Sequence, residues 1–188
     1  MGRLIYSVVC SLDGYLADEN GDFSWAFPDE QIHRHANLEM RGISLQLLGR
    51  RLYEIMVPWE TDPDLAADSE VGAEFARYWQ DSDKIVYSST LAEPLTERTR
   101  IRRSFDAREV RTLTREAPGD VVIGGPTLAA EAFRDGLVDE VRMVVMQVTI
   151  GSGLPVFPLN QRVRLSLIES TTFDGGALGL IYRVLCDA

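Results

Sequence analysis

A run of ten residues near the start of the chain, "RLIYSVVCSL", constrains the fold more than any other part of the sequence. Nearly every position in this run is apolar or β-branched. A strand with one wet face alternates between apolar and polar residues, whereas a strand buried on both faces reads as a continuous apolar run. Residues 3–12 are therefore predicted to form a strand buried on both faces. Such a strand needs helices on both sides of its sheet, which favours an α/β protein.

The rest of the chain alternates between strand-like and helix-like patterns. Further strands are predicted at residues 43–49, 83–90, 120–124 and 140–150, with a short extended segment at "RTRIRRS". Helices are predicted at residues 29–40, 50–56, 70–80, 106–115 and 127–135. Pro58 is expected to end the second helix.

The end of the chain is predicted to form a hairpin from residues 163–173 and 177–186, turning at "DGG". We therefore expect a single α/β domain over residues 1–188. Its sheet is expected to be mixed and mostly parallel, with helices on both faces and a C-terminal antiparallel hairpin.

The charge and the cysteines exclude several classes of protein. The formal net charge of −10 argues against a nucleic-acid or anionic-membrane surface, which needs clustered cations. No apolar run approaches the roughly 20 residues of a membrane span, and the start reads as a strand rather than a signal peptide. Cys10 and Cys186 lie in predicted strands and are expected to be buried, reduced thiols, with a disulfide between them as the alternative. This composition favours a cytoplasmic protein.

The carboxyl ends of the predicted strands are the places where open α/β sheets bind ligands. At the end of the second strand, "LLGRRLYE" places Gly49 at a turn and Arg50 and Arg51 at the start of a helix. Arginine offers a planar fork suited to phosphate, although solvated surface arginines are the simpler reading. The third strand ends in "VYSST", where Ser88 and Ser89 could bond a phosphate or ribose, or merely cap a loop.

The stretch "VIGGPTL" offers a third possible anion site. Gly124 and Gly125 permit a tight turn, and Pro126 suits the first position of a helix. The free N–H groups at a helix N-terminus attract anions. The stretch is neither a G-x-G-x-x-G motif nor a P-loop, so taken alone it is equally a plain corner.

Taken together and in this order, these stretches resemble the dihydrofolate reductase superfamily. The chain is most similar to the small bacterial branch related to the C-terminal reductase domain of the bifunctional riboflavin enzyme RibD. The resemblance spans nearly the whole chain and rests on "SLDGYLADENGD", "LLGRRLYE", "KIVYSSTL", "DVVIGGPTLAAEAFRDGLVDEVRMVV", "IGSGLPVF" and "GLIYRV". It implies an NADPH-dependent reductase that transfers a hydride to a small pterin-like or pyrimidine-like heterocycle.

The resemblance also implies a cofactor site at the strand ends. The basic pair would contact the cofactor phosphates, the serines would lie near the ribose 2′-phosphate, and the glycine turn would cradle the pyrophosphate. The implied cofactor-binding residues are Val9, Gly49, Arg50, Arg51, Ser88, Ser89, Gly124, Gly125, Pro126, Thr127 and Leu128. Many members have threonine after the basic pair, where this chain has Leu52, so one expected phosphate contact is missing.

The acid that assists hydride transfer is less defined. Asp13 of "SLDG" matches the aspartate that faces the substrate in RibD-like members, but an Asp-Gly pair also makes an ordinary turn. Glu30 or Asp29 could take the place of the pterin-binding acid of folate-reducing members, or could simply cap and stabilise a helix. Tyr15 and Trp25 could stack on a planar substrate or belong to the core.

The remaining expectations concern metals, partners and the alternative functions. His33 and His35 are two residues apart on a predicted helix and so point to different faces, which argues against a metal pair. The only basic cluster, Arg98, Arg100, Arg102 and Arg103, is expected to be solvated, with a secondary role at the 2′-phosphate as the alternative. Family members often form dimers, and residues 143–150 with the hairpin could supply such a surface. The alternative functions are a true 7,8-dihydrofolate reductase and a nucleotide-binding module without catalysis.

Overall fold

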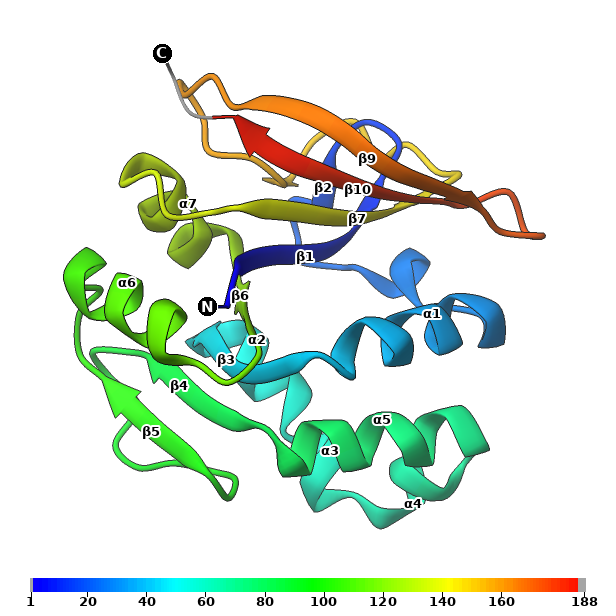
Figure 1. Ribbon diagram of the computed structural model, residues 1–188. Coiled ribbons are helices and arrows are strands. Elements are labelled where there is room, and N and C mark those ends of the chain that lie inside the picture. The colour runs from blue at the N-terminus through cyan, green and yellow to red at the C-terminus, as the bar shows by residue number, and fades with distance from the viewer. Residues whose placement is uncertain (1, 186–188) are drawn as a thin grey trace.

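The sheet of this protein has eight strands in the order β5-β4-β3-β6-β1-β7-β10-β9, in a computed structural model that describes residues 2–185 (Figure 1). All neighbouring strands from β5 to β7 are parallel, while β10 runs antiparallel to both β7 and β9. The strands of this sheet are β1 Leu4–Ser11, β3 Ile43–Gly49, β4 Asp83–Tyr87, β5 Thr99–Arg102, β6 Asp120–Gly124, β7 Glu140–Met146, β9 Arg164–Thr172 and β10 Leu178–Leu185. The predicted mixed, mostly parallel sheet is confirmed.

The helices cover both faces of this sheet, as predicted. They are α1 Glu30–Met40, α2 Arg50–Met56, α3 Pro58–Thr61, α4 Pro63–Ala67, α5 Glu70–Asp81, α6 Ala107–Glu116 and α7 Pro126–Arg134, with a 3-10 turn at Ser24–Ala26. One face packs on α6 and α7 through Val110, Ala132 and Phe133. The opposite face packs on α1, α2 and α5 through Ile32, Tyr53 and Trp79. The result is a three-layer α/β structure.

Strand β1 has the central place that its apolar sequence predicts. It pairs in parallel with β6 on one side and with β7 on the other. Leu4, Ile5 and Tyr6 are wholly buried, and so is Cys10, whose thiol is free. Burial raises the pKa of the Cys10 thiol to about 11. Cys186 lies outside the described residues.

Two strands end earlier than predicted. Strand β4 ends at Tyr87 rather than at residue 90. Strand β7 ends at Met146 rather than at residue 150, because the chain turns away from the sheet toward Gly151, which has φ +81°. Pro58 does more than end α2: it opens α3, and Pro63 opens α4, each at the first helical position, where the missing proline N–H costs nothing. No helix among residues 2–185 is long and apolar enough to cross a membrane.

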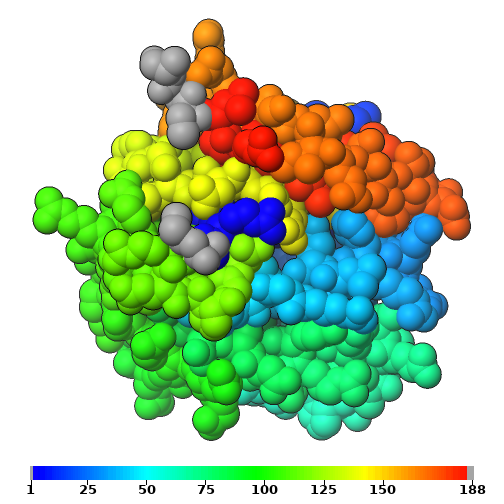
Figure 2. Space-filling model, viewed as in Figure 1, coloured from blue at the N-terminus to red at the C-terminus, as the bar shows by residue number. Residues whose placement is uncertain are grey.

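The terminal hairpin β9–β10 is confirmed and turns at the predicted glycines. Gly176, with φ +93°, donates its N–H to the Phe173 carbonyl, and Phe173 donates to the Ala177 carbonyl. The hairpin lies along one border of the molecule and exposes much of its surface (Figure 2). Among the apolar side chains there, Leu167 is 54% exposed and Ile168 is 49% exposed.

The packing of His33, on α1, makes the free energy of unfolding depend on pH. This imidazole packs against the rings of Trp59 and Phe75, at centroid distances of 5.7 and 5.4 Å. Burial lowers its pKa below the ordinary value of about 6.5. The neutral form is therefore favoured in the folded state, so its contribution is complete above about pH 6.5 and is lost as pH falls below that value.

We expect His33→Phe to reduce the loss of stability on acidification. Urea unfolding near pH 7.5 and near pH 5 would measure this, because the phenyl ring keeps the aromatic packing but binds no proton. An equal drop in unfolding free energy for the wild type and the variant would contradict this account of His33.

Candidate functional site

The exits of β3 and β6 meet backbone to backbone at the carboxyl edge of the sheet. A Cβ added to Gly125 would lie 3.5 Å from both N and Cα of Gly49, and one added to Gly49 would lie 3.6 Å from the Gly124 carbonyl oxygen. Gly125 has φ +94°, a conformation that favours glycine. The backbone conformation therefore favours glycine at residue 125, and its van der Waals contact with Gly49 sets the start of α7 beside the start of α2.

The N-terminus of α7 presents free backbone donors at this junction. The first intrahelical bond runs from the Ala129 N–H to the Gly125 carbonyl, at 2.9 Å. The N–H groups of Thr127 and Leu128 precede it and so have no partner within the helix. Gly125 supplies no side-chain cap, and Pro126 occupies the first helical position. Donors of this kind, with the positive end of the helix dipole, suit an anionic group.

Leu52 lies against the turn at Gly124. A Cβ on Gly124 would overlap Cδ2 of Leu52 and would lie 3.3 Å from Cδ2 of Leu48. The leucine that stands in place of the family's threonine thus packs directly on the turn. It offers no hydroxyl to a phosphate, and it holds the Gly124 backbone by apolar contact instead.

The two arginines after β3 differ in their surroundings. Arg50 donates to Glu54 Oε1 at 2.7 Å and to Thr90 Oγ1 at 2.5 Å, which ties the exit of β3 to the exit of β4. Arg51 is exposed on the surface of α2. Both arginines directly follow the carboxyl end of β3, and the contact of Arg50 with Glu54 is exposed.

The serines after β4 have separate tasks. Ser88 is buried, and its Oγ accepts from the N–H groups of Leu91 at 2.9 Å and Thr90 at 3.3 Å, so it caps the loop. Ser89 is exposed. Arg103 also supports this loop, because its guanidinium donates to the carbonyls of Ser88 and Leu91 at 3.1 and 2.6 Å. The sequence analysis did not predict this role.

Arg98, Arg100 and Arg103 are exposed, as predicted, and Arg102 is half-buried. Arg102 pairs with Glu109 at 2.7 Å, and Arg98 pairs with Asp83 at 3.0 Å. Like Arg103, these residues fix β5 and its flanking turns. A run of alternating arginines alone could not have revealed these partners.

The three candidate acids are each engaged by a different partner. Asp13 accepts from Ser11 Oγ at 2.6 Å and from the Gly151 N–H at 2.8 Å. The Ser11 hydroxyl, followed by the Gly151 N–H, lowers the pKa of Asp13, so its carboxylate is ionised at neutral pH. Asp29 caps α1 by accepting from the Ile32 N–H at 2.9 Å. Glu30 forms an exposed ion pair with Arg34.

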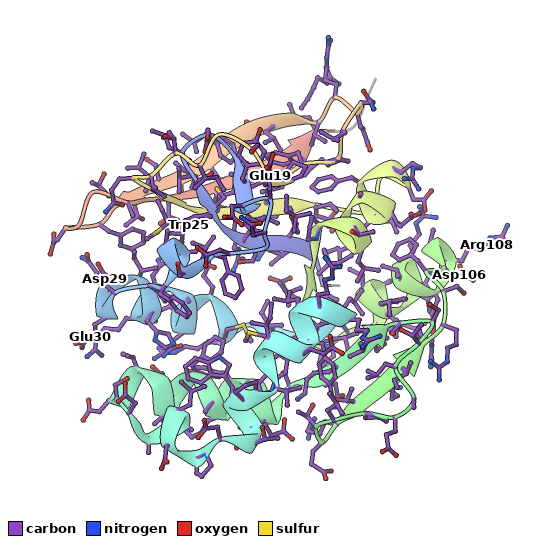
Figure 3. The ribbon with its side chains drawn as sticks, turned by 180° about the vertical axis from the view of Figure 1, so that it is seen from behind. Glu19, Trp25, Asp29, Glu30, Asp106 and Arg108 are labelled. Atoms are coloured by element: carbon purple, nitrogen blue, oxygen red, sulfur yellow. The ribbon has the colours of Figure 1, made fainter. Side chains whose placement is uncertain are left out.

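Figure 3 shows Asp29 and Glu30 together at the start of α1, with Trp25 nearby on the preceding 3-10 turn. Asp13 belongs to a separate hydrogen-bonded group at the end of β1. The structure therefore does not bring the three carboxylates into one cluster. The role of any of them as proton donor stays a prediction.

The residues predicted to border the nicotinamide and the substrate lie around β1. Val9 pairs with Val144 of β7 and packs in the apolar cluster beneath α1. Tyr15 is half-buried and starts β2, Tyr15–Ala17, which pairs with β8, Leu154–Pro155. Trp25 is half-buried, and its indole N–H is buried with no hydrogen-bond partner among residues 2–185. A buried donor without a partner costs free energy, which makes Trp25 a candidate for a ligand contact.

One hollow of the described surface lies away from these residues. A cavity of about 390 Å³ opens between α3, α4 and α5, and it is lined by Trp59, Glu60, Asp62, Pro63, Ala66, Ala67, Ala73, Ala76, Arg77 and Gln80. It contains none of the residues predicted to bind a cofactor. His33 and His35 contact different aromatic partners, and no group of three or more potential metal ligands occurs among the described residues.

Comparison with solved structures defines the class of fold. The chain is similar to dihydrofolate reductase from Enterococcus faecalis complexed with NADP(H), at a TM-score of 0.61 and 14% identity over 97% of this chain and 96% of that one. It is also similar to a putative riboflavin biosynthesis protein from Shewanella sp. PV-4, at a TM-score of 0.73 and 18% identity over 98% and 99% of the two chains. The fold is therefore dihydrofolate-reductase-like.

The family follows from the sequence. The model of the RibD C-terminal domain family matches residues 3–178, so the chain belongs to this family. Among curated relatives, the uncharacterized protein YyaP of Bacillus subtilis is 27% identical over 186 residues, which cover 96% of this chain and 94% of YyaP. The resemblance predicted from the strand-exit motifs is thus confirmed.

Proposed function

We propose that this protein is an NADPH-dependent reductase of a small pterin-like or pyrimidine-like heterocycle. Membership of the RibD C-terminal domain family and the dihydrofolate-reductase-like fold support a reductase-like role. The observation that carries the proposal is the contact of Gly49 with Gly125 beside the uncapped N-terminus of α7. The N–H groups of Thr127 and Leu128 have no partner within α7, so these donors and the turn at Gly125 form a cradle that fits a cofactor pyrophosphate.

Different residues would then bind different parts of the cofactor. The N–H groups of Thr127 and Leu128 would bind the pyrophosphate, while Arg50 and Arg51 would neutralise phosphate charge. Ser89 offers an exposed hydroxyl for the ribose 2′-phosphate, and Ser88 shapes that loop. NADPH, when bound, supplies the hydride.

The substrate would lie on the side of the edge formed by β1. Val9 gives this region an apolar wall, and Tyr15 and Trp25 offer rings for a planar heterocycle. The unpartnered N–H of Trp25 would donate to a polar atom of that ring. These side chains would orient the substrate and exclude water, which strengthens every polar contact there.

The test is NADPH oxidation by the full-length protein with a panel that includes 7,8-dihydrofolate, other pterins and aminopyrimidines. The proposal expects oxidation that depends on one class of heterocycle. Turnover restricted to dihydrofolate would favour a true dihydrofolate reductase. NADPH binding without NADPH oxidation in the presence of any compound would favour a nucleotide-binding module. Leu52 supports testing this second candidate, because it offers no hydroxyl to a cofactor phosphate.

We also propose that two copies pair through the hairpin. Strand β7 lies between β1 and β10, so both of its edges are paired and it cannot supply an open edge. Strand β9 ends the sheet and exposes Leu167 and Ile168. Sedimentation is expected to give twice the mass of the chain, and Leu167→Glu should shift it to the monomer; a monomeric wild type would contradict the pairing.

A further inference from the structure

Asp13 connects two loops that are 137 residues apart in sequence. Its carboxylate accepts from the N–H groups of both Ile150 and Gly151, at 3.2 and 2.8 Å for Oδ2, and from the hydroxyl of Ser11 at 2.6 Å for Oδ1. We propose that Asp13 is a positioning residue, whose carboxylate fixes the loop at residues 147–153 against the loop at residues 12–22. The inference deepens the proposed function and rests on it for its catalytic meaning.

The geometry of this contact suits an ionised carboxylate. Consecutive backbone N–H groups converge on one anion, and the left-handed Gly151, with φ +81°, turns the chain at that point. Every described partner of Asp13 donates to it. A protonated carboxyl group would have to place its own hydrogen against one of these donors, so the contacts oppose protonation.

Other hydrogen bonds also join the loop at residues 12–22 to the loop at residues 147–153 and its flanks, and we call this line of contacts the seam. Leu12 donates to the Val148 carbonyl at 2.8 Å, and Val156 donates to the Gly14 carbonyl at 3.0 Å. Farther along the two loops, Ser152 Oγ donates to Glu19 Oε1 at 2.9 Å. Asp13 lies within this seam. Among the described side chains, only that of Asp13 accepts hydrogen bonds from two consecutive N–H groups of the 147–153 loop.

The seam borders the proposed site on one side. Strands β6, β1 and β7 are neighbours and parallel, so their carboxyl ends lie in a row at one edge. The Gly125 turn follows β6, and the two loops follow β1 and β7. The seam therefore lies next to the proposed pyrophosphate cradle, on the side where the nicotinamide and substrate would meet. Loss of contacts in the seam would therefore affect the position of the substrate more than the binding of the pyrophosphate.

The primary test is amide hydrogen exchange at Ile150 and Gly151 in Asp13→Ala and Asp13→Asn. A hydrogen bond from an amide to a charged acceptor is stronger than one to a neutral acceptor, and an amide that loses it exchanges faster. We expect exchange at these amides to be about tenfold faster or more in Asp13→Ala, with an intermediate rate in Asp13→Asn. The asparagine keeps one acceptor oxygen and so partly restores the contact.

Asp22→Ala is the matched control, because Asp22 accepts from Ser24 within its own loop and has no described contact with residues 147–153. It should leave exchange at Ile150 and Gly151 unchanged. Unchanged exchange in Asp13→Ala, or equal acceleration in Asp22→Ala, would overturn the positioning role.

Activity separates a positioning residue from a proton donor. For the substrate that the wild type reduces, a positioning role predicts that Asp13→Asn raises KM while the acidic limb of the kcat profile stays in place. Loss of that limb in Asp13→Asn, with unchanged exchange, would make Asp13 the acid and overturn the inference. If NADPH fails to bind at all, the proposed function fails, while the exchange rates still decide whether Asp13 joins the loops.

Discussion

Replacing Gly125 with valine is expected to weaken NADPH binding at least about tenfold and to destabilise the fold by about 1–3 kcal/mol. Gly125 has φ +94°, a conformation that a β-branched residue adopts only with strain. Its Cβ would also lie 3.5 Å from the Gly49 backbone, so the added methyl groups would enter the proposed pyrophosphate cradle. Fluorescence titration with NADPH and urea unfolding would measure the two effects.

Gly136→Ala is the matched control for this variant. Gly136 follows the other end of α7, also has positive φ, at +61°, and has no atom within 4 Å of an added Cβ. The alanine should therefore cost stability through strain alone and leave NADPH affinity unchanged. Normal NADPH binding by Gly125→Val would reduce the "GGP" stretch to a structural corner.

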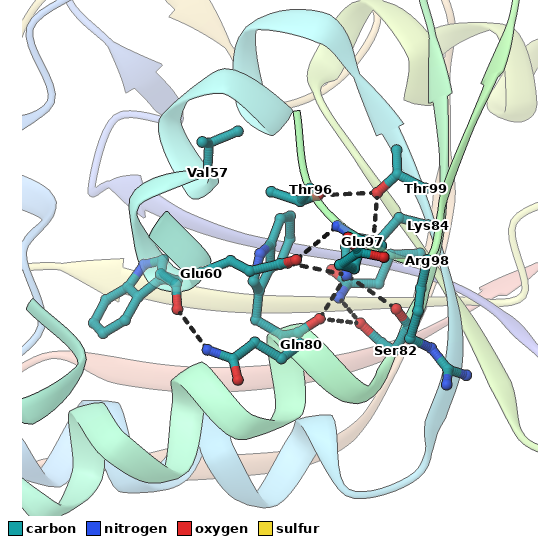
Figure 4. A network of polar contacts seen from close by, with 12 residues as sticks. Val57, Glu60, Gln80, Ser82, Lys84, Thr96, Glu97, Arg98 and Thr99 are labelled. Atoms are coloured by element: carbon teal, nitrogen blue, oxygen red, sulfur yellow. Dashed lines mark hydrogen bonds and ion pairs between the residues drawn. The ribbon is translucent and has the colours of Figure 1, made fainter. Parts of the chain in front are cut away.

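Lys84→Met is expected to lower the free energy of unfolding by about 3–5 kcal/mol, because it removes one partner of a buried charged network. Lys84 is the one lysine of the 188-residue sequence, and its side chain is wholly buried. Its Nζ donates to the carbonyls of Trp79 and Ser82, at 2.8 and 3.1 Å, and lies 3.7 Å from Glu60 Oε2 (Figure 4). Methionine would keep the length but leave Glu60 without its cation.

The double variant Lys84→Met with Glu60→Gln should recover part of this loss, because the amide carries no unpaired charge. Arg34→Met is the surface comparison: Arg34 pairs with Glu30 in the open, so its loss should cost no more than about 0.5 kcal/mol. Urea unfolding measures all three variants. A cost below about 0.5 kcal/mol for Lys84→Met would contradict the structural importance of the network.

Local patterns were enough to predict most of the sheet. The apolar run of β1 predicted its burial on both faces, and the "DGG" turn predicted the hairpin, because both depend on residues that are neighbours in sequence. The strand-exit motifs likewise predicted where Gly49 and Gly125 lie, since parallel strands end at the same edge. Their direct contact required knowledge that β3 and β6 are adjacent.

Contacts between distant residues could not be predicted in this way. The bond from Gly151 to Asp13 joins residues that are 138 positions apart in sequence, and no local pattern indicates it. The ion pair of Lys84 likewise depends on Glu60 of α3, a short helix that was not predicted. The cap at Asp62 and the prolines at positions 58 and 63 were the signals that could have identified α3 and α4.

Titration of the full-length wild-type protein with NADPH, followed by tryptophan fluorescence, tests the central claim most directly. Trp25 lies in the region proposed for the substrate and the nicotinamide, so its emission should report binding there. The account predicts saturable binding, with weaker binding of NADH because Arg50, Arg51 and Ser89 would meet no 2′-phosphate. Absence of binding at millimolar NADPH would contradict the reductase proposal.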